Sequence, residues 1–265
     1  MNAPPPAAEQ KWPQTLWLVR HGPSAGNVAR DRAEAAGDHL IDIADRDMDV
    51  PLSPLGERQA DALGRWFGGL PADQQPQLVL CSPYVRAQQT AARVRAGAGK
   101  APADLPICCD ERLREKEFGI LDRLTVHGIR QVHPQLAEQR QHVGKFYFRP
   151  PGGESWCDVI LRLRSVTEMI TREHRRQRVL IVAHQVTVNC FRYLLEGLSE
   201  AQILEIDRQA DVPNCGVTSF EYQAGRQADG RQGRLVPVLI NHVSPLTQAG
   251  EPVTQEADVP VAAKP

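Results

Sequence analysis

Residues 16–27 read LWLVRHGPSAGN: four apolar residues, then Arg20-His21-Gly22, then a run of small and polar residues. The apolar part is short, compatible with β structure and preceded by Pro13, as is typical of a buried central strand. In open α/β sheets, ligands bind at the carboxyl ends of the strands. A strand that ends at Arg20-His21 therefore predicts a cation and an imidazole at the mouth of a cleft.

The composition is that of an ordinary globular protein with no polyanionic partner. The 265 residues are 42% hydrophobic and 24% charged, and 31 basic against 32 acidic residues give a formal net charge of −1. Nucleic acids and anionic membranes bind basic footprints, which this balance lacks, so we expect neither as a partner. An anionic ligand must instead be attracted by a few placed Arg or His side chains.

Three features predict a cytoplasmic protein. The six cysteines include no C-x-x-C pair, as expected of reduced thiols. The first 14 residues are rich in Ala and Pro and lack the basic and apolar regions of a signal peptide. No apolar run approaches the roughly 18 residues that would span a bilayer.

Short apolar runs recur along the chain and alternate with segments of helical periodicity. Further strands are predicted at 77–82, 106–109, 179–184, 217–222 and 235–243, the last two joined by a Gly-rich turn at 225–233. Helices are predicted at 24–36, 53–69, 84–96, 125–132, 154–174, 187–195 and 199–206. This alternation predicts one α/β domain with a largely parallel sheet. We expect the domain to cover residues 15–245, between a disordered segment at 1–14 and a flexible tail at 246–265.

Local patterns predict where two helices start and where two irregular segments lie. Ser53-Pro54 and Ser82-Pro83 each pair a capping residue with a proline at the first helical position. Residues 37–50 are acidic and irregular, and we expect them to form a loop on the cleft side of the first strand. The basic and aromatic segment 139–151, which we expect to leave the core, could shape a substrate pocket or be a plain surface loop.

Candidate anion-binding groups follow several of the predicted strands. They are Arg20-His21, Ser82 with Arg86 one turn on, His184, and, at a less regular junction, Glu115. A lone His or Arg at such a place is more often structural, but their recurrence at one end of the sheet favours a functional site. Phosphoryl transfer through histidine needs such a set. Arg side chains bind the phosphate oxygens through two parallel hydrogen bonds, a neutral imidazole attacks phosphorus, and a carboxylic acid protonates the leaving oxygen.

Six motifs, in this order along the chain, resemble those of the histidine phosphatase superfamily, also called phosphoglycerate mutase-like. They are Arg20-His21-Gly22, residues 49–56 (DVPLSPLG), residues 82–90 (SPYVRAQQT), Leu113-Arg114-Glu115 with Phe118-Gly119, Gly153-Glu154-Ser155, and Val182-Ala183-His184. The resemblance implies a three-layer α/β/α sandwich with a mostly parallel central sheet. It also implies catalysis without metal or cofactor.

The resemblance assigns a role to each residue of the set. His21 would be the nucleophile, and Glu115 the proton donor with Glu117 as a nearby competitor. The residues that would bind the phosphoryl group are Arg20, Ser24, Asn27, Arg86, His184 and Gln185. His184 would be protonated in that role, which a bound dianion favours.

Departures from the family pattern favour hydrolysis of a small-molecule phosphate ester. Gln185 replaces the usual Gly and resembles the fructose-2,6-bisphosphatase branch, and Ala25-Gly26 stand where glycolytic mutases carry Glu-Trp. The alternatives are a phosphoglycerate mutase-type phosphomutase and a weakly active regulatory or binding member of the fold. Arg123, where many relatives have Gly, has no interpretation from sequence. The substrate and the oligomeric state stay open; a homodimer could use the closing strand pair or the 139–151 loop.

Overall fold

The computed structural model of the chain describes residues 10–101, 103–226 and 232–255. A six-stranded sheet with the order β3-β2-β4-β1-β5-β6 forms its centre. The strands are β1 (Thr15–Arg20), β2 (Leu78–Cys81), β3 (Ile107–Cys109), β4 (Arg178–Ala183), β5 (Val217–Arg226) and β6 (Gln232–His242). The neighbours β3-β2, β2-β4 and β4-β1 pair in parallel, whereas β5 is antiparallel to both β1 and β6. The predicted α/β fold with a mostly parallel sheet is confirmed.

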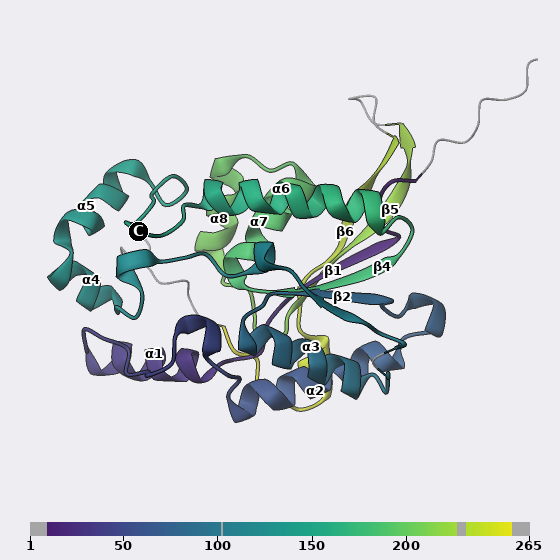
Figure 1. Cartoon of the computed structure of the whole chain (residues 1–265), viewed down its shortest axis with the longest axis horizontal. Coiled ribbons are helices and arrows are strands. Elements are labelled where there is room, and N and C mark those ends of the chain that lie inside the picture. Colours follow the sequence, from purple (N-terminus) through teal and green to yellow (C-terminus); the bar gives the residue numbers. More distant parts are fainter. Residues whose placement is uncertain (1–9, 102, 227–231, 256–265) are drawn as a thin grey trace, which may run out of the picture.

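Helices cover both faces of the sheet, so the domain has three layers (Figure 1). The helices α6 (Trp156–Glu173), α7 (Gln185–Glu196) and α8 (Glu200–Gln209) lie on one face, and α2 (Pro54–Gly69) and α3 (Val85–Gly97) on the other. The strand pleat explains the division. Leu16 and Leu18 of β1 point into the core beneath α6, whereas Trp17 and Val19 point into the core beneath α2 and α3.

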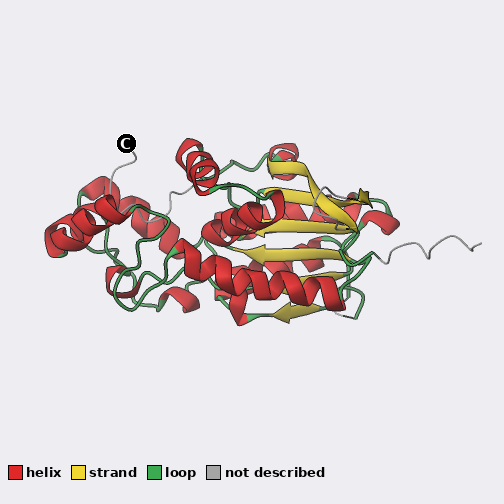
Figure 2. Ribbon diagram, turned by 90° about the horizontal axis from the view of Figure 1, so that it is seen from above, coloured by secondary structure: helices red, strands yellow, loops and turns green. Residues whose placement is uncertain are grey.

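A smaller helical unit lies beyond the carboxyl ends of the parallel strands (Figures 1 and 2). It comprises α1 (Ala25–Ala36), α4 (Val126–Val132) and α5 (Pro134–Val143) and has its own apolar cluster around Leu121, Ile129 and Phe148. A β-bridge joins Leu40 to Leu124, and the N–H of Ile41 donates to the carbonyl oxygen of Arg123 at 2.8 Å. These links bring the loop after α1 against the segment after Glu115 and so close one side of the site.

Two expectations about the ends of helices are wrong, the capping role of Ser82-Pro83 and the loop expected after Pro134. The Ser82 hydroxyl accepts a hydrogen bond from the N–H of Tyr84 and lies 2.7 Å from His184 Nε2, so it does not cap a helix, and α3 starts after Tyr84. Pro134 not only ends α4 but also opens α5, because proline suits the first helical position. Residues 139–143 are therefore helical rather than part of a loop.

The packed chain extends beyond the predicted limits of 15 and 245. At the start, Gln14 bonds with Gln177 and Tyr222 through the backbone. At the end, a short helix α9 (Ser244–Gln248) buries Leu246 completely, and Gln59 Nε2 donates to the carbonyl oxygen of Pro252 at 2.7 Å. Residues 10–14 and 246–255 are thus part of the fold rather than disordered or flexible. Residues 1–9, 256–265 and the middle of the predicted turn, 227–231, lie outside the described residues.

The helices of the described segments include none that is both long and apolar enough to cross a bilayer.

Candidate active site

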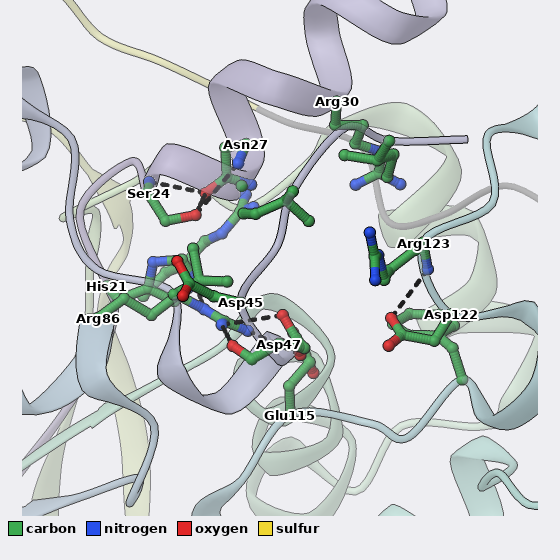
Figure 3. A pocket seen from close by; sticks show the side chains of 16 residues that line it. His21, Ser24, Asn27, Arg30, Asp45, Asp47, Arg86, Glu115, Asp122 and Arg123 are labelled. Carbon is green, nitrogen blue, oxygen red and sulfur yellow. Dashed lines mark hydrogen bonds and ion pairs between the residues drawn. The ribbon is translucent and has the colours of Figure 1, made fainter. Parts of the chain in front are cut away.

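A pocket of about 120 Å³ opens at the carboxyl ends of the parallel strands, and residues of β1, α1, α3 and the loops between the sheet and the smaller helical unit line it. Six residues that the sequence predicts for the site line this pocket: Arg20, His21, Ser24, Asn27, Arg86 and Glu115 (Figure 3). They come from β1, α1, α3 and the segment after β3, which only the fold brings together.

The imidazole of His21 is held in one tautomer. Its Nδ1 lies 2.7 Å from the carbonyl oxygen of Gly22, an acceptor, so Nδ1 carries the proton. Arg86 donates from Nε to His21 Nε2 at 3.2 Å, so Nε2 carries the lone pair. The backbone N–H of His21 also donates to the carbonyl oxygen of Ala183 at 3.0 Å, which fixes the residue at the end of β4. The nucleophilic nitrogen therefore faces the guanidinium that would hold a phosphoryl group.

Burial and positive charge keep His21 neutral. Burial lowers the pKa of the imidazole well below its ordinary value of 6.5, and the nearby Arg86 and Arg20 lower it further. The hydrogen bond to Gly22 acts in the opposite direction and is the smallest effect. A neutral imidazole is the form that can attack phosphorus.

Arg20 is positioned by a chain of hydrogen bonds that includes Gln185. Its Nη1 donates to Gln185 Oε1 at 2.7 Å and to the carbonyl oxygen of Val212 at 2.6 Å. Gln185 Nε2 in turn donates to Asp211 Oδ1 at 2.8 Å. Gln185 is not among the residues that line the pocket. The predicted phosphate ligand thus holds Arg20 from behind instead of facing the pocket.

His184 lies behind His21 and is fully buried. The two ring centroids are 5.0 Å apart, and His184 Nε2 is 2.7 Å from the hydroxyl of Ser82. No group of the described residues bonds with the buried Nδ1 of His184. Burial lowers the pKa of His184 well below 6.5, with Arg86 and His21 adding to the effect. In the free protein His184 is neutral, so the protonated form expected from sequence requires a bound anion to stabilise it.

Asp47 forms an ion pair with the guanidinium of Arg86 on the side away from His21. Arg86 Nη1 lies 3.0 Å from Asp47 Oδ1, Nη2 donates to Oδ2 at 3.2 Å, and Nη1 also donates to the carbonyl oxygen of Asp47 at 2.5 Å. The acidic loop 37–50 was predicted to lie on the cleft side of β1, and it does. Nothing in the sequence distinguishes Asp47 from the other acidic residues there, so its contact with Arg86 could not be predicted.

Ser24 and Asn27 orient each other at the start of α1. Asn27 Oδ1 accepts hydrogen bonds from the Ser24 N–H at 2.9 Å and the Ser24 hydroxyl at 2.6 Å, and the Asn27 N–H donates to the hydroxyl at 3.1 Å. This capping box satisfies the helix end. Because the amide oxygen of Asn27 is engaged, its NH₂ group is the side-chain donor left for a ligand in the pocket.

Glu115 is buried with 9% of its surface exposed and lines the pocket, whereas Glu117 does not line it. The Lys116 N–H donates to Glu115 Oε1 at 2.8 Å, and Arg162 Nη2 donates to the Glu115 carbonyl oxygen at 3.1 Å. Arg162 is itself paired with Glu154 at 3.0 Å. Glu117 instead accepts a hydrogen bond from the Tyr84 hydroxyl at 3.0 Å. The placement favours Glu115 over Glu117 as the acid.

Further charged residues that the sequence did not assign also line the pocket: Arg30, Asp45, Asp47, Asp122 and Arg123. They come from α1, the acidic loop and the segment after Phe118. Of these residues, the sequence singled out only Arg123, because it departs from the family pattern. Within the described residues, no group of three His, Cys, Asp or Glu side chains is arranged to hold a metal ion.

Comparisons with known proteins identify the family of the chain. The model of the histidine phosphatase superfamily (branch 1) matches residues 16–229. A 6-phosphofructo-2-kinase/fructose-2,6-bisphosphatase of Caenorhabditis elegans is 32% identical over 179 residues, which is 67% of this chain and 33% of that protein. A 2,3-bisphosphoglycerate-dependent phosphoglycerate mutase of Methylobacterium radiotolerans is 30% identical over 203 residues, 75% of this chain and 86% of that protein. The chain thus spans about a third of the first relative and most of the second.

Solved structures show the same fold. That of a mycobacterial glucosyl-3-phosphoglycerate phosphatase, in a complex with VO3, has a TM-score of 0.62 and 23% sequence identity. The similarity covers 86% of this chain and 99% of that one.

Proposed function

The chain belongs to branch 1 of the histidine phosphatase superfamily, and from this membership we propose that it hydrolyses small phosphate monoesters through a phosphohistidine on His21. The observation that carries the proposal is the state of the His21 ring, with Nδ1 donating to Gly22 and Nε2 free of a proton beside Arg86.

In the first step, the phosphoryl oxygens of the substrate lie against the guanidinium groups of Arg20 and Arg86. His21 Nε2 attacks phosphorus in line, a P–N bond forms, and the P–O bond to the leaving group breaks with its electron pair going to oxygen. Glu115, protonated at this stage, gives its proton to that oxygen. The Arg86 Nε–H, which points at Nε2 in the free protein, transfers its hydrogen bond to a phosphoryl oxygen.

In the second step, water attacks phosphorus on the side opposite the P–N bond. Glu115, now a carboxylate, takes a proton from the water, and the electron pair of the breaking P–N bond returns to Nε2. Phosphate leaves, and the neutral His21 and the protonated Glu115 are restored. The NH₂ group of Asn27 holds a phosphoryl oxygen through both steps, and the buried ring of His184 packs against the His21 ring.

Phosphate release from p-nitrophenyl phosphate and from small sugar phosphates, measured with a chelator present, tests the proposal. The wild-type protein should release phosphate, and the His21→Ala protein should lose this activity. His142→Ala, which changes an exposed histidine on α5, is the matched control and should keep it. Unchanged turnover in His21→Ala would refute the mechanism.

A phosphomutase is the second candidate, because a phosphoglycerate mutase that is 30% identical shares 75% of the chain. Incubation with 3-phosphoglycerate separates the two: hydrolysis gives inorganic phosphate, whereas a mutase gives the 2-isomer without net release of phosphate.

Two finer features are also proposals. The absence of C-x-x-C pairs supports a cytoplasmic location. A homodimer is supported by β6, an edge strand whose Val238 and Ile240 are exposed; light scattering of the purified protein measures its mass directly.

A further inference from the structure

The pocket contains a second pair of arginines in addition to the pair beside His21. Arg30 comes from α1, and Arg123 follows the short helical turn Gly119–Leu121. Both line the same pocket as His21 and Arg86. Figure 3 shows their guanidinium groups directed toward each other on the side of the pocket away from His21. The pocket therefore contains a second pair of guanidinium groups, which the proposed chemistry does not use.

The backbone at Arg123 is held in a conformation that favours glycine. Its φ is 62°, in the left-handed region, which costs free energy for any residue with a Cβ. The Arg123 carbonyl oxygen accepts from the Ile41 N–H at 2.8 Å, and the Arg123 N–H donates to Asp122 Oδ1 at 3.0 Å, so the surroundings enforce the conformation. Strained residues of this kind concentrate at ligand-binding sites. Glycine would relieve the strain, and the chain instead has a long cation that lines the pocket.

The charges around Arg30 and Arg123 favour an anion between them. Two guanidinium groups that face each other repel, and an oxyanion placed between them offsets this repulsion with hydrogen bonds from both. Three carboxylates, those of Asp45, Asp47 and Asp122, also line the pocket. Asp47 is paired with Arg86, and partial burial together with the negative charge of Asp47 raises the pKa of Asp122.

We propose that Arg30 and Arg123 bind a second oxyanion of the substrate. The enzyme would thus prefer a compact phosphate monoester that also carries a carboxylate or a second phosphate. This inference rests on the proposed function, since it assumes that the ester phosphate is bound at His21. A pocket of about 120 Å³ is smaller than the roughly 300–1,000 Å³ of sites for drug-sized ligands, so the two anionic groups belong to a short molecule.

Paired substrates that differ in one group test the second oxyanion. 3-Phosphoglycerate and glycerol 3-phosphate differ only in a carboxylate against a hydroxymethyl group. Propane-1,3-diol bisphosphate and its monophosphate differ in the second phosphate. In at least one pair, kcat/KM should be about 10- to 100-fold higher for the member with two anionic groups, the range expected for hydrogen bonds to a charged group. The pair that shows the preference identifies the second group as carboxylate or phosphate.

Arg123→Gly removes the guanidinium and at the same time relieves the backbone, so this variant should fold. It should reduce the preference by about tenfold or more. Arg176 provides a matched control, because it also has a left-handed backbone, with φ of 60°, and does not line the pocket. Arg176→Gly should leave the preference unchanged. For α1, Arg30→Gln should reduce the preference, and Arg32→Gln, an exposed arginine outside the pocket lining, should not.

Equal kcat/KM within both pairs, or a preference that survives Arg123→Gly and Arg30→Gln, would overturn the inference. Binding separates this failure from a failure of the proposed function. The His21→Ala protein, titrated calorimetrically with 3-phosphoglycerate and glycerol 3-phosphate and then with the two propanediol phosphates, reports the second site without turnover. A difference of at least about tenfold in Kd within one pair, lost on Arg123→Gly, supports the inference even where no hydrolysis is seen. Equal binding within both pairs overturns it even where hydrolysis is efficient.

Discussion

Arg86 donates a hydrogen bond from Nε to Nε2 of His21 at 3.2 Å, so the residue that holds the phosphoryl group also marks the nucleophilic atom. The same guanidinium is bound on its other side by Asp47. In the free protein, Arg86 is therefore hydrogen-bonded to the imidazole of His21 and paired with the carboxylate of Asp47. A phosphate group must compete with both partners for Arg86, and the predictions for Arg86 and Asp47 depend on this exchange.

Replacing Arg86 should reduce catalysis strongly. In Arg86→Gln the transferring oxygens lose a forked, charged donor, and kcat/KM should fall by about 10²- to 10³-fold. Arg93→Gln is the control on the same helix, since Arg93 pairs with Glu57 and Asp61 outside the pocket. Steady-state kinetics with p-nitrophenyl phosphate measures both. A loss of less than tenfold in Arg86→Gln would contradict the role of Arg86.

The effect of removing the general acid should depend on whether the leaving group needs a proton. In Glu115→Gln, release of an alkyl alcohol needs a proton that the amide cannot give, and kcat should fall by about 10²- to 10⁴-fold. Release of p-nitrophenolate, which leaves without protonation, should be affected much less in its first step. Stopped-flow absorbance measures that step. Glu117→Gln, whose carboxylate faces Tyr84, is the control, and a larger leaving-group effect there would move the acid to Glu117.

Asp47 should compete with phosphate for Arg86. In Asp47→Asn the ion pair is lost, and inorganic phosphate should inhibit about tenfold more strongly, the gain expected when a charged competitor is removed. Asp49→Asn removes the same charge from the same turn, where Asp49 pairs with Arg46, and should change the inhibition constant little. Weaker inhibition in Asp47→Asn would show instead that Asp47 orients Arg86 for its ligand.

Buried neutral histidines should make the fold sensitive to acid. The pKa values of His21 and His184 are lowered in the folded protein, chiefly by burial, whereas in the unfolded chain both titrate near 6.5. Below pH 6.5 the unfolded state binds more protons, so the free energy of unfolding should fall as the pH drops through this value. The limiting slope is about 1.4 kcal/mol per pH unit for each histidine. Above pH 6.5 neither group contributes a slope.

Urea unfolding between about pH 8 and pH 5 measures this dependence. Asn does not titrate, so His21→Asn and His184→Asn should each make the fall below pH 6.5 shallower. A stability that is flat across this range, or a slope that neither substitution changes, would contradict neutral histidines at the site.

Much of the site could be predicted because its residues follow strands. The apolar run 16–19 identifies β1, and parallel strands carry Arg20, His21 and His184 to the same edge of the sheet. The spacing of Arg86 after Ser82-Pro83 places it in the first turn of α3. These inferences need only local patterns and the rule that the carboxyl ends of parallel strands lie at one edge of the sheet. The order of the motifs along the chain predicted the family. Membership of the histidine phosphatase superfamily is confirmed by the match to residues 16–229.

The rest depends on contacts between loops, which no local pattern records. Asp47 and Arg123 enter the pocket because the bridge between Leu40 and Leu124 joins two irregular segments. Gln185 directly follows His184, yet its amide bonds with Arg20 and Asp211 instead of facing the pocket. The first part of the predicted tail, 246–255, packs on the domain for the same reason, since the contact of Leu246 with α2 and α3 is visible only in three dimensions.

The most direct test of the account is to trap the phosphoenzyme. In the Glu115→Gln protein, p-nitrophenyl phosphate should still transfer its phosphoryl group, whereas attack by water should lack its base, so the intermediate should accumulate. After rapid quenching of a reaction with ³²P-labelled substrate, the account predicts an alkali-stable, acid-labile label on the peptide that contains His21. The double variant Glu115→Gln/His21→Ala should carry none. Label on another residue, or turnover of the labelled substrate with His21 unmodified, would contradict the proposed mechanism.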